Sequence, residues 1–185
     1  MSRLKQLAGE KAHTRSLSIS TYPVDEKTVL VEGTLIDNRF TDFYLITGGM
    51  KPPGIVHNLV IGLLIEGPEL VIRDLEVEMI GVPKEECIQT EKSLEPIIGL
   101  KIVSGFTNQV KNLIGGVNSC IHLVSLLLAM APAALQGYWA CTTKKKIPEE
   151  LVKDSGKLSK YMINSCWVWR EDGPEVRKIM KFFKN

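Results

Sequence analysis

The sequence carries little net charge and no long uninterrupted apolar run. Its 185 residues include 23 basic and 21 acidic side chains, a formal net charge of +2, which gives no reason to expect nucleic acid as a partner. The start, MSRLKQLAGEKAHTRS, lacks the apolar stretch of a signal peptide. The most apolar run, residues 123–135, is interrupted by Ser125 and Pro132 and is shorter than the roughly 18 residues that a membrane span requires. We therefore expect a cytoplasmic protein without a membrane role.

Common catalytic signatures are also missing. The chain has no phosphate-binding loop, no GxSxG and no HExxH, and its cysteines match no compact zinc-finger spacing. The cysteines lie far apart in the sequence, and nothing indicates secretion, so we expect reduced thiols rather than disulfides. We expect Cys166, which lies between tryptophan-rich flanks, to be buried.

The first half of the chain has the alternation of β-strands. Residues 28–37 place Val29, Val31, Leu35 and Asp37 on one face, and residues 57–80 predict a hairpin whose two arms are joined by the sequence EGPE.

The second half changes to helical periodicity. It predicts short helices within residues 84–100 and 105–114, and a long one over 115–136 that Pro132 kinks or breaks. A last helix begins at Pro174. We predict a single α+β domain over residues 1–185, with an antiparallel sheet of about four strands from the N-terminal half packed by helices from the C-terminal half. Residues 1–14 are expected to form a flexible N-terminus.

Cys120 and His122 stand at the start of the long apolar helix. Residues two apart on a helix point roughly 200° away from each other, so both can face one ligand only if Cys120 precedes the regular helix. Gly115 and Gly116, followed by Asn118, supply a flexible, cap-like start. The alternative is a buried helix with a small cysteine and a hydrogen-bonded histidine.

Asp37 is a carboxylate on the parity expected to face the core. A charge there needs a partner or a task, and the candidate partners are Arg15, Arg39 or a metal ion. The alternative is that Asp37 lies just past the strand end and caps a turn.

Two further residues offer ligand atoms. His57 precedes an apolar strand and shares the parity of its core positions if no bulge intervenes, and Cys87 follows the predicted hairpin. Together with Cys120 and His122 they would form a His2Cys2 set suited to zinc or another borderline-soft metal. A partly exposed histidine at a strand end is an equally good interpretation of His57.

Several short motifs together resemble a bacterial family catalogued as domain of unknown function 2889. The resemblance spans about Thr14 to Pro174 and rests on these segments: HTRSLSISTY, VEGTLIDNRF, GIVH, PKEEC, IIGLKIVSGFTNQVKNLIGG, CIHL followed by AALQ, and NSCWVWREDGP. The family's helix start is closer to Gly-Cys-Thr-His-Leu, so Ser119 and Ile121 depart from the pattern while both candidate ligands stand. The resemblance implies motif positions for Asp37, His57, Cys87, Cys120, His122 and, less directly, Cys166. It implies no activity.

These residues support four hypotheses of function. In the first, His57, Cys87, Cys120 and His122 bind zinc or iron in an enzyme of small-molecule metabolism, and Asp37 acts as general base or orients a water. In the second, Cys120 is a nucleophile without a metal. The third is an iron–sulfur or metal scaffold, by analogy alone, and the fourth is a binding module with a structural site. A small-molecule substrate and a homo-oligomer are compatible with the sequence.

Overall fold

Four long strands form an antiparallel sheet in the N-terminal half of the chain, as predicted. The computed structural model describes residues 3–142 and 163–182. The sheet order is β1-β2-β5-β6, and each strand pairs with its neighbours antiparallel. The strands are β1 (His13–Pro23), β2 (Thr28–Arg39), β5 (Gly54–Glu66) and β6 (Val71–Gly81). The predicted connection between the last two is confirmed, because β5 ends at Glu66 and β6 begins at Val71.

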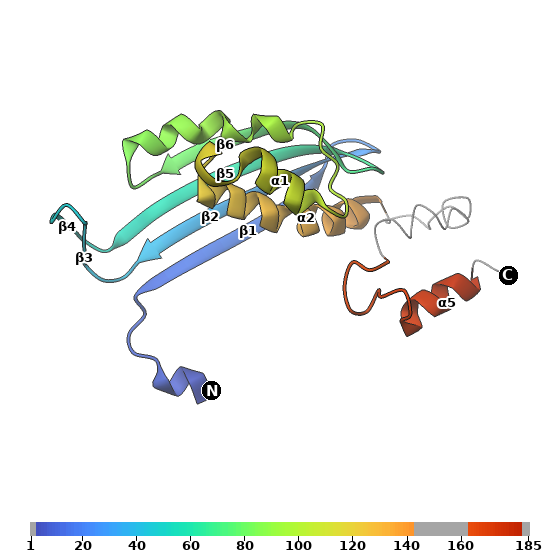
Figure 1. Cartoon of the computed structure of the whole chain (residues 1–185), viewed down its shortest axis with the longest axis horizontal. Coiled ribbons are helices and arrows are strands. Elements are labelled where there is room, and N and C mark those ends of the chain that lie inside the picture. The colour runs from blue at the N-terminus through green and yellow to red at the C-terminus, as the bar shows by residue number, and fades with distance from the viewer. Residues whose placement is uncertain (1–2, 143–162, 183–185) are drawn as a thin grey trace.

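The remaining elements are a short β-hairpin and the helices. A two-stranded hairpin of β3 (Phe43–Tyr44) and β4 (Met50–Lys51) projects beyond one end of it (Figure 1). The predicted helical segments appear as η2 (Glu85–Ile97), a 3-10 helix, and as α1 (Phe106–Ile114) and α2 (Ile121–Thr142). The last helix begins at Pro174 as predicted and forms α5 (Pro174–Phe182). The short 3-10 helices are η1 (Arg3–Leu7) and η3 (Gly116–Asn118).

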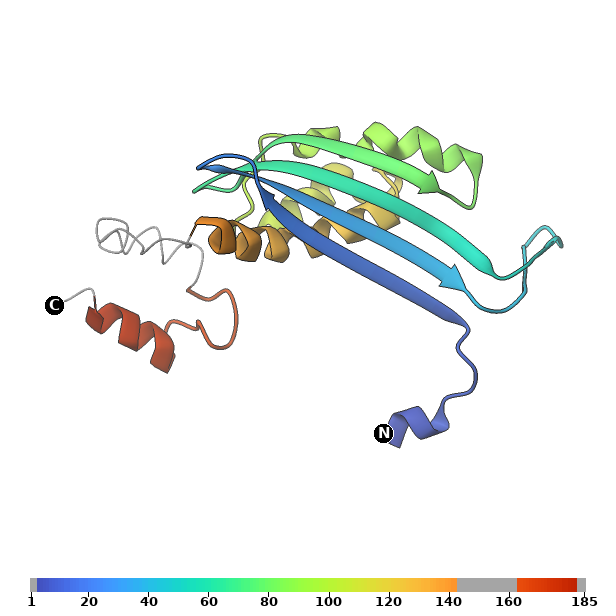
Figure 2. The ribbon, with the colours of Figure 1, turned by 180° about the vertical axis from the view of Figure 1, so that it is seen from behind.

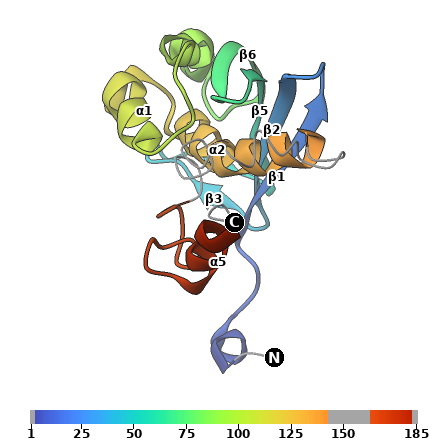
Figure 3. The same cartoon turned by 90° about the vertical axis from the view of Figure 1, so that its right-hand side faces the viewer.

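All the described helices that pack on the sheet cover the same face. Figure 3 shows η2, α1 and α2 on one side of the strands, and Figure 2 shows the sheet from the side that no described helix covers. The core lies between these layers, and the inward positions of β2 and β5 are almost fully buried. They are Val29, Val31, Leu35, Leu59, Ile61, Leu63 and Ile65. The alternation of burial along β2, and from Leu59 onward in β5, confirms the predicted parity.

Helix α2 lies unusually close to the edge of the sheet formed by β1. A Cβ atom on Gly137 would lie 2.0 Å from the Thr21 Oγ1 atom and 2.5 Å from its Cβ, so only glycine permits this approach. Pro132 was expected to kink or break this helix, and the helix continues through it without a break. By length and composition alone α2 could cross a membrane. Seven of its residues are nevertheless buried within the protein, and core helices pass the same test.

Two local expectations are corrected by the structure. Cys166 is exposed rather than buried, because it lies in a turn-rich segment outside the core. His13 and Thr14, placed by the sequence in the N-terminal segment expected to be flexible, are the first two residues of β1 and pair with Arg39 and Asn38.

Candidate Asp/His/His site

Three polar side chains form a row across three neighbouring strands, near one end of the sheet. In β2, Asp37 lies directly opposite Arg15 of β1 and directly opposite His57 of β5. Residues paired in this way point to the same face of a sheet, and Asp37 shares the parity of the buried Leu35. The row therefore faces the helices. The Asp37 carboxylate lies on the core face of the sheet, as the alternation of β2 predicts.

Arg15 is the principal partner of Asp37. Its Nε donates to Oδ1 and its Nη2 donates to Oδ2, each over 2.7 Å, which is the two-pronged geometry of the strongest arginine–carboxylate pairs. Asp37 is only 3% exposed. The hydrogen bond from Arg15 outweighs burial and, with the charges of Arg15 and His57, lowers the pKa of Asp37 to about 2. The carboxyl group is therefore ionised at neutral pH.

Arg39, the other arginine considered as a partner, is not in this contact. Its guanidinium lies over the ring of Phe43, 4.2 Å from the ring centroid.

His57 makes the shortest histidine contact with the carboxylate. Its Nδ1 lies 2.9 Å from Asp37 Oδ2, and its side chain is 12% exposed. An ionised carboxylate can only accept, so the proton of a neutral His57 is assigned to Nδ1 and the lone pair to Nε2. No bulge separates His57 from Leu59, Ile61 and Leu63 in the pairing with β2, so His57 does share their face.

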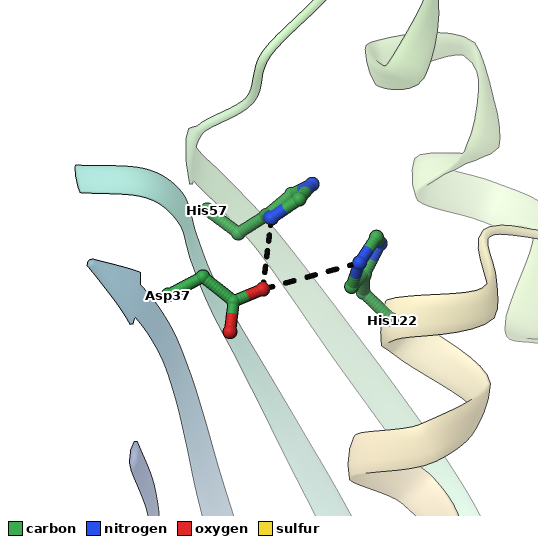
Figure 4. A group of neighbouring side chains, drawn as sticks. All are labelled: Asp37, His57 and His122. Atoms are coloured by element: carbon green, nitrogen blue, oxygen red, sulfur yellow. Dashed lines mark hydrogen bonds and ion pairs between the residues drawn. The ribbon is translucent and has the colours of Figure 1, made fainter. Parts of the chain in front are cut away.

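His122 reaches the same carboxylate from the first turn of α2. Its Nε2 lies 3.9 Å from Asp37 Oδ2, and its ring centroid is 3.8 Å from that of His57. Figure 4 shows His57 and His122 approaching Asp37 from the sheet and from the helix. Burial, together with the charges of His57 and Arg15, lowers the pKa of His122 although Asp37 opposes the change. The neutral imidazole, the form that binds metals, is therefore favoured.

Cys120 lies just before α2, as the cooperation of Cys120 with His122 requires. The helix begins at Ile121, and the Cys120 carbonyl accepts its first hydrogen bond, from Val124 N–H at 3.0 Å. The Cys120 Sγ lies 3.6 Å from His122 Nδ1. The two nitrogens of His122 thus face different partners, Nδ1 the thiol and Nε2 the carboxylate.

A third histidine, which the sequence analysis missed, completes the surroundings of Asp37. The Nε2 of His13 lies 3.3 Å from Asp37 Oδ1, and the His13 side chain is 48% exposed. The sequence did contain a signal for His13. It precedes Arg15 by two residues in the same strand, and side chains two apart in a strand point to the same face, so His13 points to the same side as Arg15. All three histidines of the sequence therefore contact one carboxylate.

The group that could hold a single ion consists of Asp37, His57 and His122. One ligand atom from each lies within 4.8 Å of the others. This grouping, found among the described residues, consists of one aspartate and two histidines. It therefore differs from the predicted set of two histidines and two cysteines. Cys120 contacts His122 from outside it. Cys87 lies in η2, half-buried, where its carbonyl accepts from Thr90 Oγ1 at 2.7 Å.

Fold and site together define an α+β protein in which helices cover one face of a four-stranded antiparallel sheet and an Asp/His/His grouping lies between the two layers. A family model described as Protein of unknown function (DUF2889) matches residues 13–136. The chain belongs to this family, which confirms the resemblance for the motifs within residues 13–136; the segment NSCWVWREDGP lies outside the match. The match includes every residue of the grouping and Arg15. Comparisons with curated proteins and with solved structures give no match.

Proposed function

We propose that Asp37, His57 and His122 bind one divalent transition-metal ion and that the protein is a metal-dependent enzyme acting on a small molecule. The observation that carries this proposal is the approach of one carboxylate oxygen and two imidazole nitrogens within 4.8 Å. Two histidines and a carboxylate suit zinc, and also ferrous iron when coordination positions are left open. Three protein ligands leave such a position, whereas a fourth would close the site and make it structural.

The distances are close to those that one ion would impose. Ligand atoms about 2.0–2.1 Å from an ion lie roughly 3 Å from one another. The Asp37 Oδ2 to His57 Nδ1 distance is already 2.9 Å. The distance to His122 Nε2 is 3.9 Å, so His122 has to move by about 1 Å toward the carboxylate. His57 has to transfer its proton from Nδ1 to Nε2, since a ligand nitrogen must be unprotonated.

The surrounding residues prepare these ligands. Arg15 keeps Asp37 ionised and fixes the orientation of its carboxylate through two hydrogen bonds. The Cys120 thiol faces the Nδ1 of His122 and so turns its Nε2 toward Asp37. His13 is half-exposed beside Oδ1 and is placed to exchange a proton with a bound molecule. A bound ion would supply Lewis acidity at the open position.

The test is the metal content of purified protein after incubation with Zn²⁺ or Fe²⁺ and removal of free ion. We expect one ion per wild-type chain and less than a tenth of that in His57→Ala and His122→Ala. Cys87→Ala is the matched control and keeps full occupancy. Stoichiometric metal in the histidine variants would refute the proposed ligands. Loss of bound metal in Cys87→Ala would instead support the ligand set of two histidines and two cysteines predicted from the sequence. Circular dichroism of each variant separates ligand loss from unfolding.

A second candidate function uses Cys120 as a nucleophile without a metal. It is favoured by the 3.6 Å contact between Cys120 Sγ and His122 Nδ1, because an adjacent base activates a thiol nucleophile. Alkylation at neutral pH distinguishes it. This mechanism requires Cys120 to react much faster than the exposed Cys166, and to slow down in His122→Ala. Equal or slower labelling of Cys120 excludes it.

A further inference from the structure

A pocket of about 550 Å³ adjoins His57. Its walls come from the end of β2, the β3–β4 hairpin, the start of β5 and the residues after β6, so it lies at the end of the sheet from which the hairpin projects (Figure 1). The volume falls within the roughly 300–1,000 Å³ of small-molecule sites. His57 belongs to both the pocket lining and the Asp/His/His grouping. A molecule in the pocket therefore lies beside the proposed metal ligands.

The charged side chains that line the pocket are both positive. They are Arg39 and Lys51, and no carboxylate of the described residues lines the same pocket. Within residues 3–142 and 163–182, neither cation forms an ion pair with an acidic side chain. The Arg39 guanidinium lies over the ring of Phe43, 4.2 Å from the ring centroid, and its planar set of N–H donors suits a planar anion.

The remaining wall of the pocket is apolar and stiff. Phe43, Ile55 and Val82 contribute apolar surface, and Pro52 and Pro53 fix the backbone between β4 and β5. Apolar walls favour burial of a hydrocarbon or aromatic body. Arg39 and Lys51, neither of which pairs with an acidic side chain of the described residues, favour a carboxylate, because arginine matches its two oxygens with two parallel hydrogen bonds.

We propose that this pocket binds a small carboxylate with an apolar or aromatic body, its carboxylate on Arg39 and Lys51 and its other end beside His57. The substrate class of the proposed enzyme is then an apolar or aromatic organic acid. The catalytic consequence rests on the proposed function, but binding in the pocket does not, because the lining cations are separate from the metal ligands.

The experiment measures binding of benzoate, phenylacetate and hexanoate to metal-free protein in the presence of EDTA, with benzamide as the uncharged isostere of benzoate. Titrations followed by NMR report both the dissociation constants and the perturbed residues. We expect the carboxylates to bind at least about tenfold more tightly than benzamide, equivalent to about 1.4 kcal/mol, and to perturb Val56 and His57. Arg39→Gln and Lys51→Gln should each weaken carboxylate binding by about tenfold.

Arg73→Gln is the matched control, because Arg73 is an exposed arginine that pairs with Glu66 and does not line the pocket. Equal binding of benzoate and benzamide, unchanged affinity in Arg39→Gln and Lys51→Gln, or no binding of any of the three acids would each overturn the proposal. The use of metal-free protein separates the two proposals. Loss of metal in His122→Ala with intact carboxylate binding supports both the metal site and the pocket. Wild-type protein that binds these acids but no metal would support the carboxylate pocket and refute the metal site.

Discussion

Replacement of Asp37 by asparagine tests the electrostatic account of the site, because asparagine has the shape of a protonated aspartic acid. The pKa of Asp37 is lowered from 3.8 to about 2 in the folded protein. At about 1.4 kcal/mol for each pH unit between these values, the ionised carboxylate contributes about 2 kcal/mol to the free energy of unfolding. Asp37→Asn in EDTA should therefore be less stable than the wild type by about 2 kcal/mol at neutral pH.

The pH dependence of this difference identifies its cause. A carboxyl group whose folded pKa is lowered stabilises the protein fully above its unfolded pKa, and the stabilisation is lost as the pH falls through the folded pKa. Urea unfolding of both proteins should show a difference of about 2 kcal/mol near pH 5, with more than half of it gone near pH 2.5. Asp42→Asn removes an exposed carboxylate and should change little. A difference between wild type and Asp37→Asn that stays constant over this range would refute the reasoning and attribute the loss to packing.

Two further predictions concern helix α2. Gly137→Ala forces its new Cβ into Thr21, and this overlap should exceed the gain in helix propensity of about 1 kcal/mol, so that the free energy of unfolding falls by about 1–2 kcal/mol. Gly62→Ala, whose Cβ would meet its nearest neighbour at 3.8 Å, should be neutral or slightly stabilising in the same urea assay. An unaltered stability of Gly137→Ala would argue against the close approach of α2. NMR titration of metal-free protein should give His122 a midpoint below 6.5, since burial lowers its pKa, and a midpoint at or above that value would contradict its burial.

The sheet side of the site could be predicted from the sequence because strand alternation is a local signal. The parity of Val31 and Leu35 with Asp37 placed the carboxylate on the core face, and burial of a charge there required a partner, for which Arg15, Arg39 and a metal ion were the candidates. The long helix was predicted to begin at residue 115 and begins at Ile121. Helix geometry alone did give the condition that Cys120 must precede the regular helix if it is to cooperate with His122. These inferences need only the backbone period and the cost of burying a charge.

The grouping itself depends on tertiary packing, which the period of the sequence does not contain. Cys87 was chosen as a ligand because it follows the hairpin, but the chain there enters a 3-10 helix, and Cys87 stays outside the grouping. The contact of His122 with Asp37 requires the start of α2 to lie over β2 and β5. His13 was missed because the segment before Arg15 was assigned to a flexible terminus, although β1 begins at His13.

The row of Arg15, Asp37 and His57 determines where the sequence can tolerate an insertion. Arg15, Asp37 and His57 meet only in one register of β1, β2 and β5, and one residue inserted within β2 before Asp37 would turn the carboxylate to the uncovered face. An insertion in the β3–β4 hairpin leaves this register intact while it reshapes the wall that holds Phe43 and Lys51. The β3–β4 part of the proposed acid pocket can thus diversify without loss of the register that fixes the proposed ligands, whereas Arg39 and His57, which line the same pocket, lie within β2 and β5.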